Sequence, residues 1–220
     1  MVDAKQFVAG LVEEMQQVFA QLGTQETLES ESQGQVEMKT LLQAALKSEL
    51  EASELAGMWM PSTAEIDVKQ MFAQQCADEM KHYDLIARRL RELGEDLVGF
   101  DAVGEGYSPL YHYLRGLRTT VERVAGGPFA REAIAEVRNA QFVVWCKAVG
   151  DAATAKLYEA TIGPDETHHH AWGRELLEKY CTTPELQDLA AAAARNTLAI
   201  ADELRTLAEK TKGRGPAPVS

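Results

Sequence analysis

Cysteine, long apolar runs and clustered positive charge are all scarce in this 220-residue sequence. The three cysteines are odd in number and widely separated, which argues against a disulfide framework and favours a reducing compartment, so we expect a cytoplasmic protein. The longest apolar stretches, 142–146 and 189–194, are far shorter than the ~20 residues of a membrane span. We therefore expect no membrane association. The first twenty residues also lack the basic start and apolar run of a signal peptide.

The charge balance is strongly acidic, with 22 Lys and Arg against 34 Asp and Glu and a net charge of −12. Nucleic-acid binding needs a basic surface, and no Lys/Arg cluster occurs, so nucleic acid is excluded as a partner. Glycine-rich nucleotide loops and the signatures of Ser or Cys nucleophiles are missing as well. The length suits one domain, or one domain with appended elements.

The apolar residues repeat with the period of a helix. The alternation of apolar and polar residues that is typical of strands is nearly absent. Apolar residues instead recur at i, i+3, i+4 and i+7, in windows rich in Ala, Leu, Glu, Gln, Lys and Arg. The sequence therefore predicts an all-α protein.

Breaks in this pattern divide the chain into an N-terminal helix with a polar linker (1–35), a four-helix region (36–180), a C-terminal helix (181–211) and a disordered tail (212–220). Within the four-helix region, Pro61 and Gly94 end the first two helices, and Ser62-Thr63 is expected to cap the second. Residues 94–127 form a long connection that is rich in glycine at first and is expected to be helical again over 110–124. Pro128 is expected in the first turn of the third helix, and Gly150 separates the third helix from the fourth.

One short string occurs twice. Residues 78–82 and 165–169 both read Asp-Glu-x-x-His, 87 positions apart. Positions i and i+3 lie on the same face of a helix. The side chains of Glu79 and His82 can therefore point in the same direction, and so can those of Glu166 and His169. Two copies on separate helices are much less probable by accident than one.

The spacing to the preceding helices indicates further partners. Thirty residues before Glu79 lies Glu49, and thirty residues before Glu166 lies Glu136. The midpoints, 64 and 151, coincide with the expected turns of two hairpins. Since residues equidistant from a hairpin turn sit at the same height, each Glu should face its own Glu-x-x-His. Glu51 and Glu132 remain alternatives on the same two helices.

Four carboxylates and two imidazoles form a hard, oxygen-rich donor set that suits iron or manganese. One Glu from each of two helices, with a Glu-x-x-His from each of the other two, resembles the ferritin-like di-iron carboxylate superfamily. The resemblance implies a four-helix bundle in which residues 94–127 form the crossover. It also implies two metal ions, with iron the first choice and Mn/Fe or Mn as alternatives. Glu79 and Glu166 would bridge the ions, and Glu49 and Glu136 would be terminal ligands.

The same resemblance gives roles to the residues beside these ligands. It implies that Asp78 and Asp165 hydrogen-bond the ligating His of the opposite pair. His170 could substitute for His169 or support it; the alternative is that His168 and His170 are polar surface residues. Pro164 lies two residues before Glu166 and should bend the fourth helix near the metal.

The function expected from this resemblance is that of an oxygen-activating oxidase or oxygenase with a small organic substrate, and no catalytic residues beyond the metal site. The partners would be that substrate, O2 and an electron donor that the sequence does not identify. A ferroxidase or iron-handling protein and a non-catalytic metal-binding bundle are the alternatives. The oligomeric state is open, with a homodimer one option.

Overall fold

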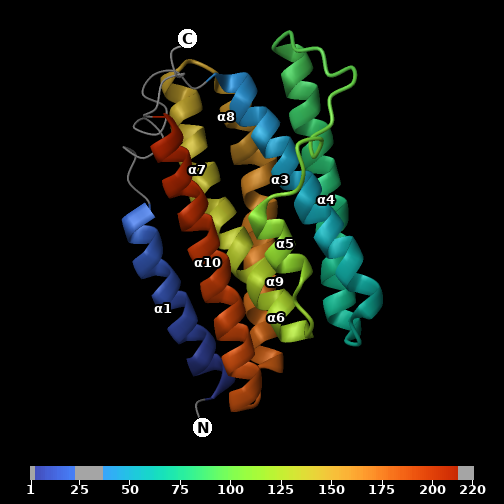
Figure 1. Cartoon of the computed structure of the whole chain (residues 1–220), viewed down its shortest axis with the longest axis vertical. Coiled ribbons are helices and arrows are strands. Elements are labelled where there is room, and N and C mark those ends of the chain that lie inside the picture. The colour runs from blue at the N-terminus through green and yellow to red at the C-terminus, as the bar shows by residue number, and fades with distance from the viewer. Residues whose placement is uncertain (1–2, 23–36, 213–220) are drawn as a thin grey trace, which may run out of the picture.

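The described part of the chain is helical, with no strand, as the periodicity predicted. The computed structural model describes residues 3–22 and 37–212, with side chains for 3–19 and 37–203. The helices lie side by side along the long axis of the molecule (Figure 1). The linker expected over 24–35 and the tail from residue 213 lie outside the described residues.

The elements, in order, are α1 (Ala4–Leu22), α3 (Met38–Trp59), η1 (Met60–Ser62), α4 (Ile66–Glu92), α5 (Pro109–Arg115), α6 (Thr120–Val124), η2 (Ala125–Arg131), α7 (Glu132–Ala148), α8 (Ala152–Leu157), η3 (Tyr158–Ile162), α9 (Gly163–Tyr180) and α10 (Pro184–Lys212).

Helices α3 and α4 pack against each other and are joined through the short 3-10 turn η1. The expectation that Ser62 and Thr63 cap the second of them is wrong. Their hydroxyls instead donate to the carbonyl oxygen of Trp59, at 3.3 and 2.9 Å, and so satisfy the end of α3. Helix α4 begins three residues later, after Glu65, without a side-chain cap.

The third helical run is continuous across Pro128, where the sequence indicated the start of a new helix. Thr119 and Glu122 form a reciprocal capping box that begins α6, and the helix then continues through η2 into α7 without a break. Pro128 therefore lies inside a helical run, in the π-helical segment η2, and not in the first turn of a new helix. The long connection ends at Thr119 because the capping box, and not the proline, sets the start of the run.

The fourth run consists of α8, η3 and α9. Gly150 has φ +85°, a left-handed conformation that glycine adopts without strain, and Asp151 then caps α8 by accepting from the backbone N–H of Thr154 at 2.9 Å. Pro164 lies in the first turn of α9, directly after the π-helical segment η3. The irregularity expected near Pro164 is thus a wider helical turn just before it.

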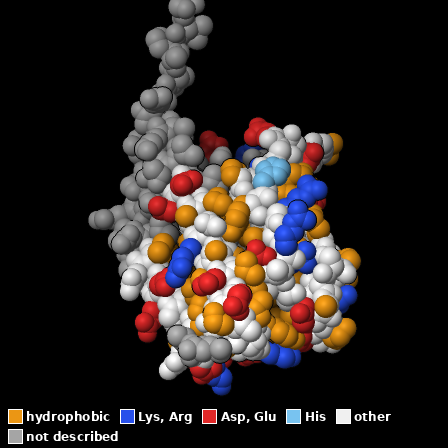
Figure 2. Space-filling view, turned by 60° about the horizontal axis from the view of Figure 1, so that its bottom comes forward, with side chains coloured by type: hydrophobic (Ala, Val, Ile, Leu, Met, Phe, Trp, Pro, Cys, Tyr) orange, Lys and Arg blue, Asp and Glu red, His pale blue; other side chains and the backbone are white. Residues whose placement is uncertain are grey.

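The terminal helices cover the third and fourth runs: α10 packs on α6 and η2, and α1 packs on α9 and α10 (Figure 1). On the face in Figure 2, acidic and basic side chains are interspersed with apolar ones. Among the described helices, none combines the length and apolar character that crossing a membrane requires.

The buried apolar side chains form two separate cores, one toward each end of the four runs. On α3, Leu46 belongs to one core and Leu55 to the other; on α4, Ile86 and Phe72 divide in the same way. Between the two cores, each run carries buried acidic or imidazole side chains. This buried polar band crosses the middle of the molecule.

Candidate metal centre

Six side chains from the four helical runs converge in the polar band. One group consists of Glu49, Glu79, His82 and Glu166, and the other of Glu79, Glu132, Glu166 and His169. In each group the potential ligand atoms all lie within 4.8 Å of one another. The two groups share Glu79 and Glu166. The structure therefore offers two adjacent positions for cations, with two carboxylates common to both.

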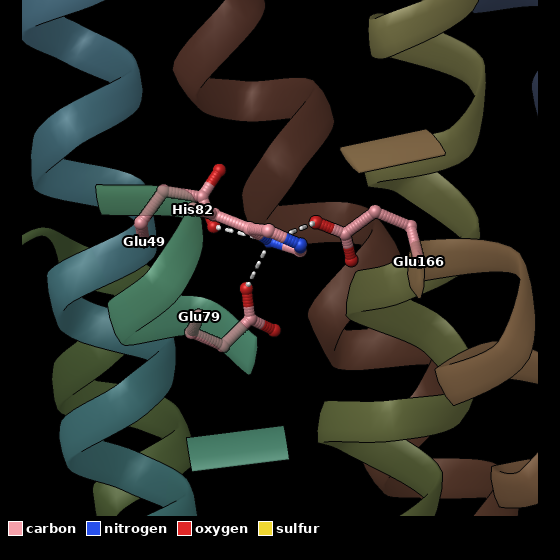
Figure 3. Close-up of side chains that lie close together, drawn as sticks. All are labelled: Glu49, Glu79, His82 and Glu166. Atoms are coloured by element: carbon pink, nitrogen blue, oxygen red, sulfur yellow. Dashed lines mark hydrogen bonds and ion pairs between the residues drawn. The ribbon is translucent and has the colours of Figure 1, made fainter. Parts of the chain in front are cut away.

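His82 lies at the centre of the first group (Figure 3). Its Nδ1 is 3.2 Å from Oε2 of Glu79, 3.4 Å from Oε2 of Glu49 and 3.8 Å from Oε1 of Glu166. These three carboxylates come from α4, α3 and α9 and turn toward the imidazole (Figure 3). Ligand atoms ~2.1 Å from one ion lie ~3 to 4 Å apart, so such spacing suits a shared ion.

His169 has the matching place in the second group. Its Nδ1 lies 3.6 Å from Oε1 of Glu79 and 3.9 Å from Oε2 of Glu166. This Nδ1 is buried and has no hydrogen-bond partner, and the same holds for Oε2 of Glu166 and Oε2 of Glu132. Buried polar atoms without partners are rare in proteins. Three such atoms in one cluster are what a cation site would leave without hydrogen bonds, because these atoms would be the ligands of the ion.

An aspartate from the opposite motif orients each imidazole. The Nε2–H of His82 donates to Oδ2 of Asp165 at 3.0 Å, and that of His169 donates to Oδ2 of Asp78 at 3.2 Å. The crossed pairing that the resemblance implied is thus present in the structure. It fixes the orientation of each ring, with Nε2 at the aspartate and Nδ1 directed at the carboxylates of the cluster.

The carboxylates repel one another in this buried setting. Burial raises the pKa of Glu49 to about 7, against the lowering effect of its contact with His82. Burial, together with the charges of Glu132 and Glu79, raises the pKa of Glu166 well above its ordinary value. Although burial acts the other way, Glu49 and Glu79 raise the pKa of His82 to about 11. Two divalent cations would offset the four carboxylates and relieve this repulsion.

Glu132, and not Glu136, joins the group. Glu132 is fully buried, whereas Glu136, one turn further along α7, is half-buried and does not belong to either group. The 30-residue spacing pointed to the wrong turn of α7, because Glu49 and Glu79 are 30 residues apart whereas Glu132 and Glu166 are 34 apart. The second hairpin has the shorter connection, three residues (149–151) against six (60–65), so its extra residues lie within the helical runs and not in the turn. Equal separations in sequence therefore do not mark equal heights in the two hairpins.

The remaining sequence candidates lie elsewhere. Glu51 is as buried as Glu49, at 7% exposure, but it accepts hydrogen bonds from the backbone N–H and the hydroxyl of Ser108, at 2.7 and 2.6 Å. It thus fastens the start of α5 to α3. His170 makes a 2.7 Å contact through Nδ1 with the carbonyl oxygen of Phe129 and stacks on its ring, and His168 is exposed. Neither histidine reaches the cluster.

Two residues that the sequence did not single out support Glu132. Gln75 donates through Nε2 to Oε1 of Glu132 at 2.7 Å, and the Arg131 guanidinium donates to the same oxygen at 2.8 Å. Arg131 also donates to the carbonyl oxygen and hydroxyl of Ser48 on α3, at 2.8 and 2.9 Å. Gln75 could have been found from its place one turn before Glu79 on the same face of α4.

The two π-helical segments lie next to this cluster. Segment η2 ends immediately before Glu132, and η3 ends four residues before Glu166. π-Helical turns are rare overall, but many of those that occur lie at functional sites, where the extra residue redirects side chains.

Comparison of the chain with known protein families, curated proteins and solved structures finds no match. The functional argument therefore depends on the geometry of the cluster.

Proposed function

We propose that the chain is a di-metal carboxylate protein with a ferritin-like four-helix arrangement, and that it activates oxygen to oxidise a small organic substrate. The observation that supports this most directly is the pair of overlapping donor groups that share Glu79 and Glu166. Each group adds one imidazole and one further carboxylate to these shared residues. A buried set of four carboxylates would be costly without cations to balance it.

In this proposal Glu79 and Glu166, which belong to both donor groups, would hold both ions. Glu49 and His82 complete one site, and Glu132 and His169 complete the other. Oxygen-rich donors with one imidazole per ion suit iron, with manganese as the alternative metal. When bound, two such ions supply redox equivalents and a Lewis-acid site at which oxygen can react.

The surrounding residues of the chain prepare the ligands for this task. Asp78 and Asp165 accept from Nε2 of the two imidazoles and direct the Nδ1 atoms at the position where an ion would bind. Gln75 and Arg131 occupy Oε1 of Glu132 and leave its Oε2 directed at the cluster. Glu79, His82 and His169 are fully buried, so the residues exclude water from the reacting space.

The proposal can be tested by anaerobic loading of the purified chain with iron(II), followed by measurement of O2 consumption and of native particle size. We expect stoichiometric O2 uptake by a small particle, and loss of that uptake in the His82→Ala and His169→Ala variants. A large shell that accumulates excess iron would favour the ferroxidase alternative. Absence of metal binding would refute the proposal and leave a non-metal scaffold.

A further inference from the structure

A cavity of about 290 Å³ lies between α3 and α7 and reaches the proposed metal centre. Leu41 and Ala45 line it from α3, Ala135 and Phe142 line it from α7, and Phe19 lines it from α1. An apolar cavity of ~150 Å³ can hold benzene, so this one accommodates roughly ten to twelve non-hydrogen atoms. Its size and walls suit a small, largely apolar molecule.

The cavity meets the cluster on the side of Glu49. Glu49 and Glu166 line it, whereas His82, Glu132 and His169 are not among its lining residues. Glu49 belongs to one of the two donor groups, together with His82 (Figure 3). A molecule in the cavity would therefore approach the ion position of this group, and not the one held by Glu132 and His169.

The charged side chains of the lining are already engaged. Glu49 and Glu166 belong to the proposed metal centre. Arg131 donates to Glu132, and Arg138 also has an interaction partner. Among the described residues of the lining, no charged group is thus left to pair with an ionic ligand. An ion would lose its hydration here without gaining a partner of opposite charge, so the cavity favours a neutral molecule.

Tyr158 gives the cavity one buried hydrogen-bonding group. It is 3% exposed and lines the cavity, with its ring against that of Phe142 at a centroid distance of 4.8 Å and an angle of 76°. No described residue forms a hydrogen bond with its hydroxyl. A phenol can donate one hydrogen bond, and a buried tyrosine usually has a partner for it. This hydroxyl is therefore suited to a molecule that occupies the cavity.

The π-helical segment η3 begins at Tyr158 and sets its backbone. The N–H of Gly163 donates to the carbonyl oxygen of Tyr158, five residues earlier, and a Cβ at position 163 would lie 3.0 Å from that oxygen. Burial, followed by the charge of Glu49, raises the pKa of Tyr158 well above its ordinary value. The hydroxyl therefore stays protonated, and it lies within electrostatic reach of the metal centre.

We propose that this cavity is the substrate site, and that its substrate is a neutral, largely apolar molecule with one oxygen that accepts a hydrogen bond from the Tyr158 hydroxyl. This inference rests on the proposed function, because it assigns the substrate class of the same metal centre. Holding the oxygen at Tyr158 fixes which carbon atoms of the molecule face Glu49. The ketone 1-indanone is a suitable probe, because it matches the cavity in size and can accept but not donate. Indane is the matched hydrocarbon without the oxygen.

The test is isothermal titration of 1-indanone and indane into the full chain, both metal-free and loaded with zinc(II), with the metal content of each sample measured. Tyr158→Phe keeps the ring and removes the hydroxyl, so it should weaken 1-indanone binding about five- to tenfold and leave indane binding unchanged. Tyr113→Phe, a half-buried tyrosine on α5 outside the lining, is the matched control and should change neither. Equal loss of both compounds in Tyr158→Phe would show a packing role and overturn the assignment.

Infrared spectroscopy tests the hydrogen bond itself. A hydrogen bond to the ketone oxygen weakens the C=O bond, so the carbonyl stretch of bound 1-indanone should lie at lower frequency in the wild type than in Tyr158→Phe. Asn139, a half-buried residue of the lining, is the competing donor. A shift that is lost in Asn139→Ala and kept in Tyr158→Phe would overturn the role of Tyr158.

Occupancy of the cavity is tested by filling it. Ala135→Phe should abolish binding of both compounds, and Ala44→Trp, at an exposed position of the lining, should weaken both without perturbing the core. Ala140→Trp, at an exposed position of α7 outside the lining, is the control. Unchanged binding in both filled variants would overturn the assignment of the cavity. Full metal content with no binding would refute this inference alone, whereas absence of metal would refute the proposed function.

Discussion

Replacing Glu49 with Gln should stabilise the metal-free chain and weaken metal binding, two effects of opposite sign. Glu49 is one of four buried carboxylates in the cluster, and its pKa is raised from 4.5 to about 7. Each pH unit of displacement corresponds to ~1.4 kcal/mol, so an ionised Glu49 costs up to ~3 kcal/mol of folding free energy. This figure already includes the favourable contact with His82.

The sign of the pH dependence follows from the raised pKa. Between pH 4.5 and about 7 the folded chain keeps the Glu49 proton that the unfolded chain has lost, so the stability of the wild-type chain falls as pH rises through this window. Above about pH 7 the contribution is constant. The advantage of Glu49→Gln should therefore be near zero at pH 4.5 and reach its full value by pH 8.

Glu51→Gln is the matched control because Glu51 lies on the same helix with the same 7% exposure. Its carboxylate accepts from Ser108 and faces α5, so the substitution should destabilise the chain by ~1 kcal/mol or more and leave metal binding unchanged. Denaturant unfolding at pH 5 and pH 8, with and without manganese(II), measures both variants. Identical behaviour of Glu49→Gln and Glu51→Gln would refute the reasoning.

Three further outcomes are expected. Glu132→Gln should lower the metal content measured by elemental analysis, whereas Glu136→Gln should not; a loss of metal in the latter variant would contradict the placement of the cluster. Asp165→Ala should weaken metal affinity about 10- to 100-fold in a competition titration, because it removes the acceptor that orients His82, and unchanged affinity would show that this contact is dispensable. Gly127→Ala should destabilise the fold by ~1 to 3 kcal/mol in thermal melts, since a Cβ there would lie 2.7 Å from the Trp59 ring, while Gly10→Ala, with no atom within 4 Å, should not.

The helical class and most of the cluster could be predicted because they depend on local periodicity. The repeated Asp-Glu-x-x-His string places Glu79 with His82, and Glu166 with His169, on helix faces whatever the rest of the fold does. Proline and glycine near residues 61 and 150 marked the two hairpin turns correctly. The crossed aspartate contacts came from the resemblance, and the structure has them.

Other features depend on tertiary detail that spacing does not encode. Glu132 and Glu136 share a helix face one turn apart, ~6 Å along the axis, so only the packing of the helical runs against one another decides between them. The π-helical segments have no propensity signal in the sequence, and one of them contains Pro128 within a helical run. The contact of Arg131 with Ser48 depends on η2 and α3 approaching each other, which no local pattern reports.

The number of metal ions per chain tests the central claim most directly. After anaerobic incubation with iron(II) and removal of unbound metal, elemental analysis should find two ions per chain in the wild type. In the His82→Ala/His169→Ala double variant that number should fall below one, while the helical content stays unchanged by circular dichroism. A wild type with no retained metal, or a double variant that still retains two ions, would contradict the account.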